Sequence, residues 1–397
     1  MNARLTQIAS RWWFKVSAIW LATRLVTLAI FLVAASLQGD NYWTKAQPSY
    51  FDFLNIWDVE WYGRIFDHGY PTSLPVNADG VAAQNEWAFM PLFPMLVRVL
   101  ATLTGLEWRF AAPILATLFS FFAAAMIFKL FARLMPERQA LWGVALVGLW
   151  CASPVLQTGY AESLALAFLA WALVLIHDRR YSASLIPIAL LTFTRPGSLA
   201  LAFTLVLVWA VRFVVARRGG EAFSSAQRLR LGVAAAAASA IGFAWMLAAW
   251  VFTGRPDAYL ATELAWRSGY LGDNRLTPFE GWLASFNFHF GQPVGAFALL
   301  AVVLFTAYVL TWPSVRALAA AHLWVIAYFV YLLAVFFPQS STWRILLPAF
   351  PLLGALAGPV SRSNRAVQVV LVAALIALQI WWVLTCWNYT APDFTPP

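Results

Sequence analysis

Long apolar runs recur along the whole chain, and they restrict its fold more than any other feature of the sequence. Examples are residues 20–37, 199–216 and 367–384. A helix crosses the hydrocarbon core of a bilayer with about 20 residues, and these runs approach that length. Several are apolar around the full helix circumference, which is typical of membrane helices rather than amphipathic soluble ones. Together with a mean hydropathy of +0.72, the pattern predicts an all-α polytopic membrane protein.

We predict about eleven transmembrane helices. The fifth is short for a full crossing, and the sequence TRPG at 194–197 should end it, because proline and glycine interrupt helices. No repeat or low-complexity linker is evident, so we expect residues 1–397 to form one transmembrane domain. The expected spans are 12–37, 110–131, 139–156, 160–177, 182–194, 198–216, 230–253, 294–312, 317–337, 344–358 and 366–387.

The charged residues divide between the two sides that these spans define. Most basic residues lie in short loops on one side, whereas only Glu137, Asp178 and Glu221 of the 17 acids fall there. Basic loops face the cytoplasm in membrane proteins. We therefore expect a cell-membrane protein with a cytoplasmic N-terminus and most carboxylates outside. The net charge of +9 then reflects orientation in the lipid bilayer, and we expect no nucleic-acid partner.

Two long segments are expected on the extracytoplasmic side, at about 38–109 and 254–293. The first contains the semi-apolar piece FMPLFPMLVRVLATL. Counting that piece as a full span would place a basic loop outside, so we expect a helix that lies in the interface or re-enters it.

The stretch NIWDVEWYGRIFDHGYP, residues 55–71, concentrates charges at the outer end of the first span. Aromatic rings around Asp58 exclude water in part, which favours a base that works near neutral pH. Glu60, Trp61 and Tyr62 follow and are expected to bind substrate. Asp58 and Glu60 together could hold a divalent metal ion, but such pairs are common by chance and we expect no required cofactor. An interfacial belt of aromatic and charged residues explains the stretch equally well.

Tyr160 and Glu162, in TGYAESLAL, open the fourth span at its outer end. An acid in the first turn of a helix interacts favourably with the helix dipole, and this is a sufficient structural explanation. The functional interpretation is that both residues line the mouth of a cavity and bind hydroxyl groups.

Two arginines lie at outer helix ends. Arg195 belongs to the TRPG break, and broken helices at membrane depth mainly line cavities or pack in protein. Arg344 begins the tenth span after a polar cluster in which Ser341 or Thr342 would cap the helix. Each arginine could bind a phosphate group with its guanidinium fork. Arg195 could instead extend to the interface, and Arg344 could belong to an ordinary capped helix start.

Three further cations are candidates of lower specificity. Arg267 and His289 lie in the second outer segment, and either could contact a lipid phosphate, although a lone interfacial cation usually does not. Arg24 lies within the first span, where a charge is costly and normally faces the protein interior. We expect a structural ion pair there.

Five blocks of sequence resemble a known family. WDVEWYGRIFDHGYP, AFMPLFPMLVR, GYAESLALAFLAW, TRPGSLAL and RILLPAFPL appear in that order. The same order is found in PIG-V-like mannosyltransferases, which belong to the GT-C class of polytopic glycosyltransferases. The resemblance extends from the first span to the tenth, and W-D-x-x-W-Y and F-x-P-L-F-P are its most specific blocks.

The resemblance implies a sugar donor on a polyprenyl phosphate and a reaction on the extracytoplasmic face. The Asp after the first span, here Asp58, is the general base expected in this class. It would take a proton from an acceptor hydroxyl, which attacks the anomeric carbon of the lipid-linked mannose with inversion. Arg195 or Arg344 would stabilise the leaving phosphate. The outer loops are shorter than in animal members and the spans look bacterial, so we expect a lipid, glycolipid or glycan of the cell envelope as acceptor.

Three alternatives remain open from the sequence. The same scaffold could transfer another sugar such as arabinose or glucose, because mannose follows from analogy alone. A transporter or lipid flippase predicts inverted repeats and polar residues near the midplane, whereas here the polar residues gather at one face. A non-catalytic subunit of an envelope-assembly complex is the third.

Overall fold

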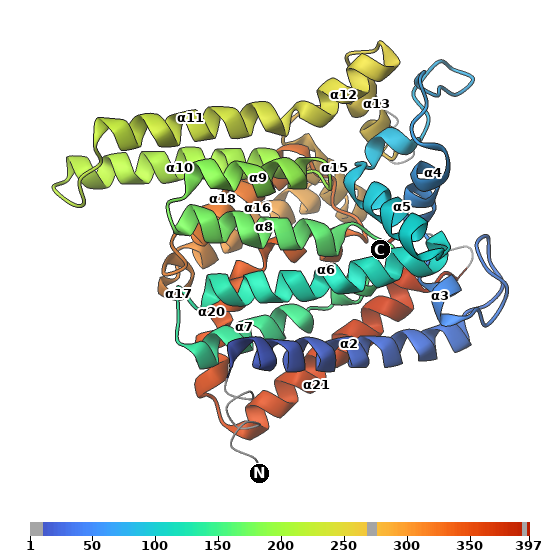
Figure 1. Cartoon of the computed structure of the whole chain (residues 1–397), viewed down its shortest axis with the longest axis horizontal. Coiled ribbons are helices and arrows are strands. Elements are labelled where there is room, and N and C mark those ends of the chain that lie inside the picture. The colour runs from blue at the N-terminus through green and yellow to red at the C-terminus, as the bar shows by residue number, and fades with distance from the viewer. Residues whose placement is uncertain (1–10, 268–275, 391–394) are drawn as a thin grey trace. The chain divides into compact units, whose positions relative to one another are not determined.

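The structure is a computed structural model that describes residues 11–267, 276–390 and 395–397 (Figure 1). Helices account for most of these ranges. The described residues also contain an isolated antiparallel β-bridge between Val76 and Ala82. The chain divides into two compact units, each described by itself. Unit 1 contains the described residues up to Glu60, Val97–Val174 and those from Ser340 onward, and unit 2 contains Trp61–Leu96 and the described part of Leu175–Gln339.

The predicted multi-pass helical architecture is confirmed. Within the described ranges, five helical segments are long and apolar enough to cross a membrane, or six if one bent pair counts as a single span. The other apolar helices have 10–17 residues, so their length does not establish the predicted count of eleven. The five segments are Trp12–Leu37, Trp108–Phe131, Ser198–Arg217, Ser225–Thr253 and Arg365–Trp387.

Unit 1 carries the N-terminal and C-terminal spans. Its elements are α2 (Trp12–Leu37), α3 (Tyr50–Phe53), the start of α4 (Val59–His68), most of α5 (Leu92–Thr104), α6 (Trp108–Phe131), α7 (Glu137–Gly148), the 3-10 helix η2 (Ser153–Gln157), most of α8 (Glu162–His177), α19 (Thr342–Ile345), the 3-10 helix η3 (Leu347–Ala349), α20 (Pro351–Arg362), α21 (Arg365–Trp382) and the π-helical turn η4 (Val383–Trp387).

Helix α7 packs against α2, α6 and α20 in unit 1. The buried ring of Phe131 in α6 lies against Gly143 of α7 and Gly354 of α20. A Cβ atom at Gly143 would lie 2.5 Å from this ring, and one at Gly354 would lie 2.4 Å from it. Small residues thus allow these three helices to approach closely, as is common between helices in membrane proteins.

Some predicted spans are interrupted by loops or short helices. The predicted span 344–358 is split into α19, η3 and α20, with a bend of 73°. Pro348 and Pro351 stand at the starts of η3 and α20, and proline supplies no amide hydrogen to continue a helix. The predicted span 139–156 likewise ends at Gly148 and is followed by η2.

Unit 2 contains the central part of the chain. Its elements are the rest of α4, the 3-10 helix η1 (Glu86–Ala88), the start of α5, α9 (Tyr181–Thr192), α10 (Ser198–Arg217), α11 (Ser225–Gly242), α12 (Ala244–Thr253), α13 (Ala258–Ala265), α15 (Glu280–Phe290), α16 (Val294–Leu310), α17 (Pro313–Arg316) and α18 (Ala320–Val335). Helices α9, α10 and α11 lie side by side (Figure 1), and α10 also packs against α18.

The predicted break at TRPG is present in unit 2. Helix α9 ends at Thr192, and α10 begins at Ser198 after Gly197, whose φ of 125° suits glycine alone. The semi-apolar piece of the first outer segment forms α5, whose 13 residues are fewer than a full crossing requires. Its position in the membrane interface stays a prediction.

Candidate active site

Asp58 directly precedes α4 and follows a residue with unusual backbone geometry. Trp57 has a φ of 64°, a left-handed conformation that is rare for a bulky side chain. Its buried indole donates a hydrogen bond to the carbonyl oxygen of Trp387 at 2.7 Å. The packing of Trp57 thus fixes the turn from which the Asp58 side chain emerges, and such conformations gather at functional sites.

Asp58, Arg344 and Glu162 form a chain of two ion pairs inside unit 1. Arg344 Nη2 lies 3.1 Å from Asp58 Oδ2, and Arg344 Nη1 lies 2.8 Å from Glu162 Oε1. The side chains of Arg344 and Glu162 are 8% and 5% exposed, whereas that of Asp58 is 23% exposed. One cation therefore serves two carboxylates, and Asp58 is the member of the group that solvent or a substrate can reach.

Tyr160 joins this group from the loop before α8. Its buried hydroxyl oxygen accepts a hydrogen bond from the backbone N–H of Asp58 at 3.1 Å. The guanidinium carbon of Arg344 lies 4.9 Å from the centre of the Tyr160 ring, which is the range of a cation–π interaction. The predicted residues Asp58, Tyr160, Glu162 and Arg344 are thus brought together by elements far apart in the sequence.

The close approach of these segments depends on Gly159. A Cβ atom at this position would lie 2.7 Å from Val59 Cγ1 and 3.3 Å from Ala112 Cβ. Any larger residue would push the Tyr160 loop away from the start of α4. Gly159 was part of a quoted motif, but its role was not predicted.

The C-terminal segment supplies residues that sequence reasoning missed. The Trp387 ring lies 5.5 Å from the Tyr160 ring, and its indole donates to the carbonyl oxygen of Phe53. Gln38 fixes the next turn by donating to the carbonyl oxygen of Tyr389 at 2.8 Å and accepting from its N–H at 3.0 Å. Trp387 is the last residue of a π-helical turn, and no feature of the sequence indicated its position.

The three predicted substrate-binding residues that come after Asp58 in the motif have separate surroundings. Glu60, in unit 1, accepts a hydrogen bond from the Trp43 indole at 3.0 Å. In unit 2, Trp61 stacks on Phe89 and also contacts the Arg64 guanidinium, while Tyr62 is buried among aromatic rings that include Phe89. Substrate binding by these three residues stays a prediction.

A second group of charges lies within unit 2. Arg195, Glu263 and Arg267 lie within electrostatic reach of the hydroxyl groups of Tyr259 and Tyr331. Burial, and to a lesser degree the Glu263 charge, raises the pKa of Tyr259 well above its usual range, so this phenol stays neutral. Burial lowers the pKa of Arg267, whose guanidinium donates to the carbonyl oxygen of Val335. The predicted phosphate-binding cations Arg195 and Arg267 therefore share one environment.

The structure also shows the surroundings of His289 and of the helix start before Arg344. His289 is exposed near the end of α15 and contacts the Phe288 ring. The predicted helix cap before Arg344 is absent, because the Ser341 side chain makes no capping hydrogen bond and α19 has only four residues. So short a helix has little dipole, and Arg344 is held instead by its two carboxylates.

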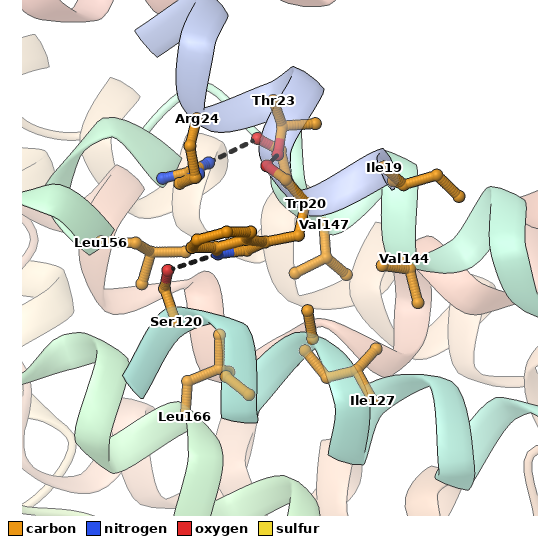
Figure 2. A pocket seen from close by; sticks show the side chains of 13 residues that line it. Ile19, Trp20, Thr23, Arg24, Ser120, Ile127, Val144, Val147, Leu156 and Leu166 are labelled. Atoms are coloured by element: carbon orange, nitrogen blue, oxygen red, sulfur yellow. Dashed lines mark hydrogen bonds between the residues drawn. The ribbon is translucent and has the colours of Figure 1, made fainter. Parts of the chain in front are cut away.

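Arg24 lies beside a small cavity lined by α2, α6, α7, η2 and α8 (Figure 2). Its guanidinium donates to the carbonyl oxygens of Gly148 and Ser153, both at 2.9 Å, rather than to a carboxylate in the described contacts. Trp20 closes one side and donates to Ser120 Oγ at 2.8 Å. The cavity has about 20 Å³, room for one water molecule, so it cannot hold a sugar.

Comparison with solved structures identifies the fold. The apo oligosaccharyltransferase of Archaeoglobus fulgidus matches 95% of this chain with a TM-score of 0.51 and 13% identity. ArnT from Cupriavidus metallidurans, solved with undecaprenyl phosphate, matches 89% with a TM-score of 0.49 and 18% identity. The chain spans 57% and 63% of the lengths of these two proteins. No family model and no curated protein sequence matches the chain.

The helical architecture of the described residues is therefore the GT-C fold of membrane glycosyltransferases. This confirms the predicted fold class, while identities of this size establish nothing about substrates. The resemblance to PIG-V-like proteins is supported only by the five sequence blocks and stays a prediction.

Proposed function

We propose that this chain is an integral-membrane glycosyltransferase of the PIG-V-like group. It moves mannose from a polyprenyl-phosphate donor to a lipid, glycolipid or glycan acceptor on the extracytoplasmic face. The observation that carries the proposal is the partly exposed carboxylate of Asp58, held by Arg344 and the Tyr160 loop beside an otherwise enclosed group of charges. Sugar transfer needs one such accessible carboxylate, oriented and kept ionised, to act as a base.

In the proposed reaction, Asp58 accepts the proton of an acceptor hydroxyl. The hydroxyl oxygen forms the new bond to the anomeric carbon, and the bond from this carbon to the phosphate oxygen breaks with its electron pair. In-line displacement inverts the configuration, so a β-linked donor gives an α-mannoside. The polyprenyl phosphate leaves as an anion, and a phosphate is a good leaving group without an obligatory metal ion.

Arg195 and Arg344 stay the candidates for stabilising the leaving phosphate. Arg344 already donates both terminal nitrogens to carboxylates, and its buried Nε has no hydrogen-bond partner among the described residues. Arg195 lies with Arg267 and Glu263 in unit 2. Each of these cations therefore needs a separate test.

The fold supports sugar transfer over the alternatives. One solved neighbour that shares the fold, with a TM-score of 0.51, is an oligosaccharyltransferase, and this favours an enzyme over a lipid flippase or a non-catalytic assembly subunit. The choice of mannose over arabinose or glucose follows only from the resemblance of the sequence blocks.

The decisive experiment uses the purified full chain in lipid nanodiscs. It is given polyprenyl-phosphate donors carrying labelled mannose, glucose or arabinose, together with a total extract of envelope glycolipids as acceptor. We expect transfer from the mannose donor, and mass spectrometry of the product then identifies the acceptor. Transfer from the glucose or arabinose donor alone would show that mannose is the wrong donor sugar. Absence of transfer from all three donors would contradict the proposed activity.

A further inference from the structure

Glu162 differs from Asp58 in its access to solvent. Its side chain is 5% exposed, against 23% for Asp58. Burying a carboxylate is costly unless a cation and hydrogen bonds compensate it. Asp58 is partly open to a substrate hydroxyl, whereas Glu162 is almost fully enclosed and ion-paired with Arg344. This makes direct substrate contact a poor explanation for Glu162.

The guanidinium of Arg344 is held on three sides. Nη1 contacts Glu162 Oε1, Nη2 contacts Asp58 Oδ2, and the centre of the Tyr160 ring lies 4.9 Å from Cζ. A guanidinium is a rigid planar fork, so fixing one terminal nitrogen sets the direction of the other. The Glu162 contact therefore determines where Arg344 presents its second nitrogen to Asp58.

Glu162 affects both the direction in which Arg344 points and the positive charge that Arg344 presents to Asp58. The titratable groups near Asp58 are Arg344 from α19, Tyr160 and Glu162 from the start of α8, and Glu60 from α4. With Glu162 present, the positive charge of Arg344 is divided between two carboxylates. Without it, Arg344 would face Asp58 alone and stabilise its ionised form further. An over-stabilised carboxylate is a weaker base.

We propose that Glu162 is a positioning residue that aims Arg344 at Asp58 and balances its charge. The proposal rests on the proposed function only in taking Asp58 as the general base. The ion-pair geometry itself does not depend on the reaction. It predicts that the protonation of Asp58 responds to Glu162, which binds the other terminal nitrogen of Arg344.

The first test measures that protonation without any substrate. Infrared difference spectra of the purified protein are recorded across a pH series, and the carboxyl band lost in Asp58→Asn identifies Asp58. We expect Glu162→Gln to lower the midpoint of this band by about one pH unit, a tenfold change in the acidity constant. Glu162→Asp keeps the charge but shortens the side chain, so it should lower the midpoint by a smaller but still measurable amount.

Glu137→Gln is the matched control, because Glu137 makes an exposed ion pair with Lys15 in the same unit. Its Asp58 band should match that of the wild type. An unchanged midpoint in folded Glu162→Gln would overturn the proposal. If that variant does not fold, Glu162→Asp decides, since its shorter side chain should move the midpoint measurably in the same direction, and no movement there would overturn the proposal too.

The second test measures transfer kinetics. We expect Glu162→Gln to lower kcat by about a hundredfold, the size of effect that a misplaced supporting group causes, with the donor KM changed by less than about twofold. The acidic limb of its pH–rate profile should move to lower pH. A rise in the acceptor KM alone would instead make Glu162 an acceptor-binding residue. If the wild type transfers no sugar while the infrared shift is present, the proposed function fails and the positioning role stands.

Discussion

The Nη1 atom of Arg344 lies 2.8 Å from Glu162 Oε1, although 182 positions separate the two residues in the sequence. The pair joins the start of α8 to the short helix α19, and both side chains are almost fully enclosed. Through Nη2 the same guanidinium also contacts Asp58. We therefore expect a change in this pair to affect both the stability of unit 1 and the chemistry proposed for Asp58.

Loss of Arg344 should destabilise the protein. Arg344→Met leaves the enclosed carboxylate of Glu162 without its cation, and removing one partner of a buried ion pair typically costs about 3–5 kcal/mol. We expect a clear fall in the thermal unfolding temperature of the purified protein. Adding Glu162→Gln to this variant should recover part of the loss, because the uncompensated charge is gone. A double variant no more stable than Arg344→Met would contradict this explanation.

Gly159 offers a steric test of the same region. In Gly159→Ala the new methyl group would lie 2.7 Å from Val59 Cγ1, and overpacking of this kind typically costs about 1–3 kcal/mol. Because Tyr160 and Asp58 flank the contact, transfer activity should fall more steeply than stability. Gly39→Ala is the control, since no atom lies within 4 Å of a Cβ built there. Equal effects of the two substitutions would exclude a role for this close approach.

The two candidate phosphate ligands can be compared by donor binding. Arg195→Ala and Arg344→Ala should each weaken binding of the polyprenyl-phosphate sugar more than binding of the acceptor, because only the donor carries the phosphate. Separate titrations of donor and acceptor measure this. A variant that weakens both equally, or only the acceptor, would lose its assignment as a phosphate ligand.

The orientation in the membrane follows from the charge distribution and is directly measurable. A reporter fused after Arg217, at the end of α10, should be cytoplasmic. One inserted near Asp79, which lies in an exposed turn, should be extracytoplasmic. The opposite pair of results would place the Asp58 site on the cytoplasmic side and contradict the proposed donor.

The helices were predictable because apolar runs of this length have few other stable structures. Their interruptions were only partly predictable. The TRPG break was expected from its proline and glycine, and Gly197 indeed lies between α9 and α10. The prolines at 348 and 351 carry the same signal, but the run that contains them was predicted as a single span, 344–358.

The site was predicted as a set of residues rather than as a geometry. Charged side chains in an apolar chain are costly, so Asp58, Glu162 and Arg344 were recognisable as candidates. Their pairing was not, because it depends on the bend after α19 and on the closeness that Gly159 permits. Trp387 was missed because a tryptophan at the end of an apolar run has many structural explanations.

Turnover by Asp58→Asn is the measurement that tests the central claim most directly. The substitution preserves size but removes the basic carboxylate. With the mannose donor in nanodiscs, we expect a loss of at least about a thousandfold in kcat, within the range for a lost general base, and an unchanged elution profile in size-exclusion chromatography. Near-normal turnover of the folded Asp58→Asn protein would show that another group accepts the proton and would contradict the account.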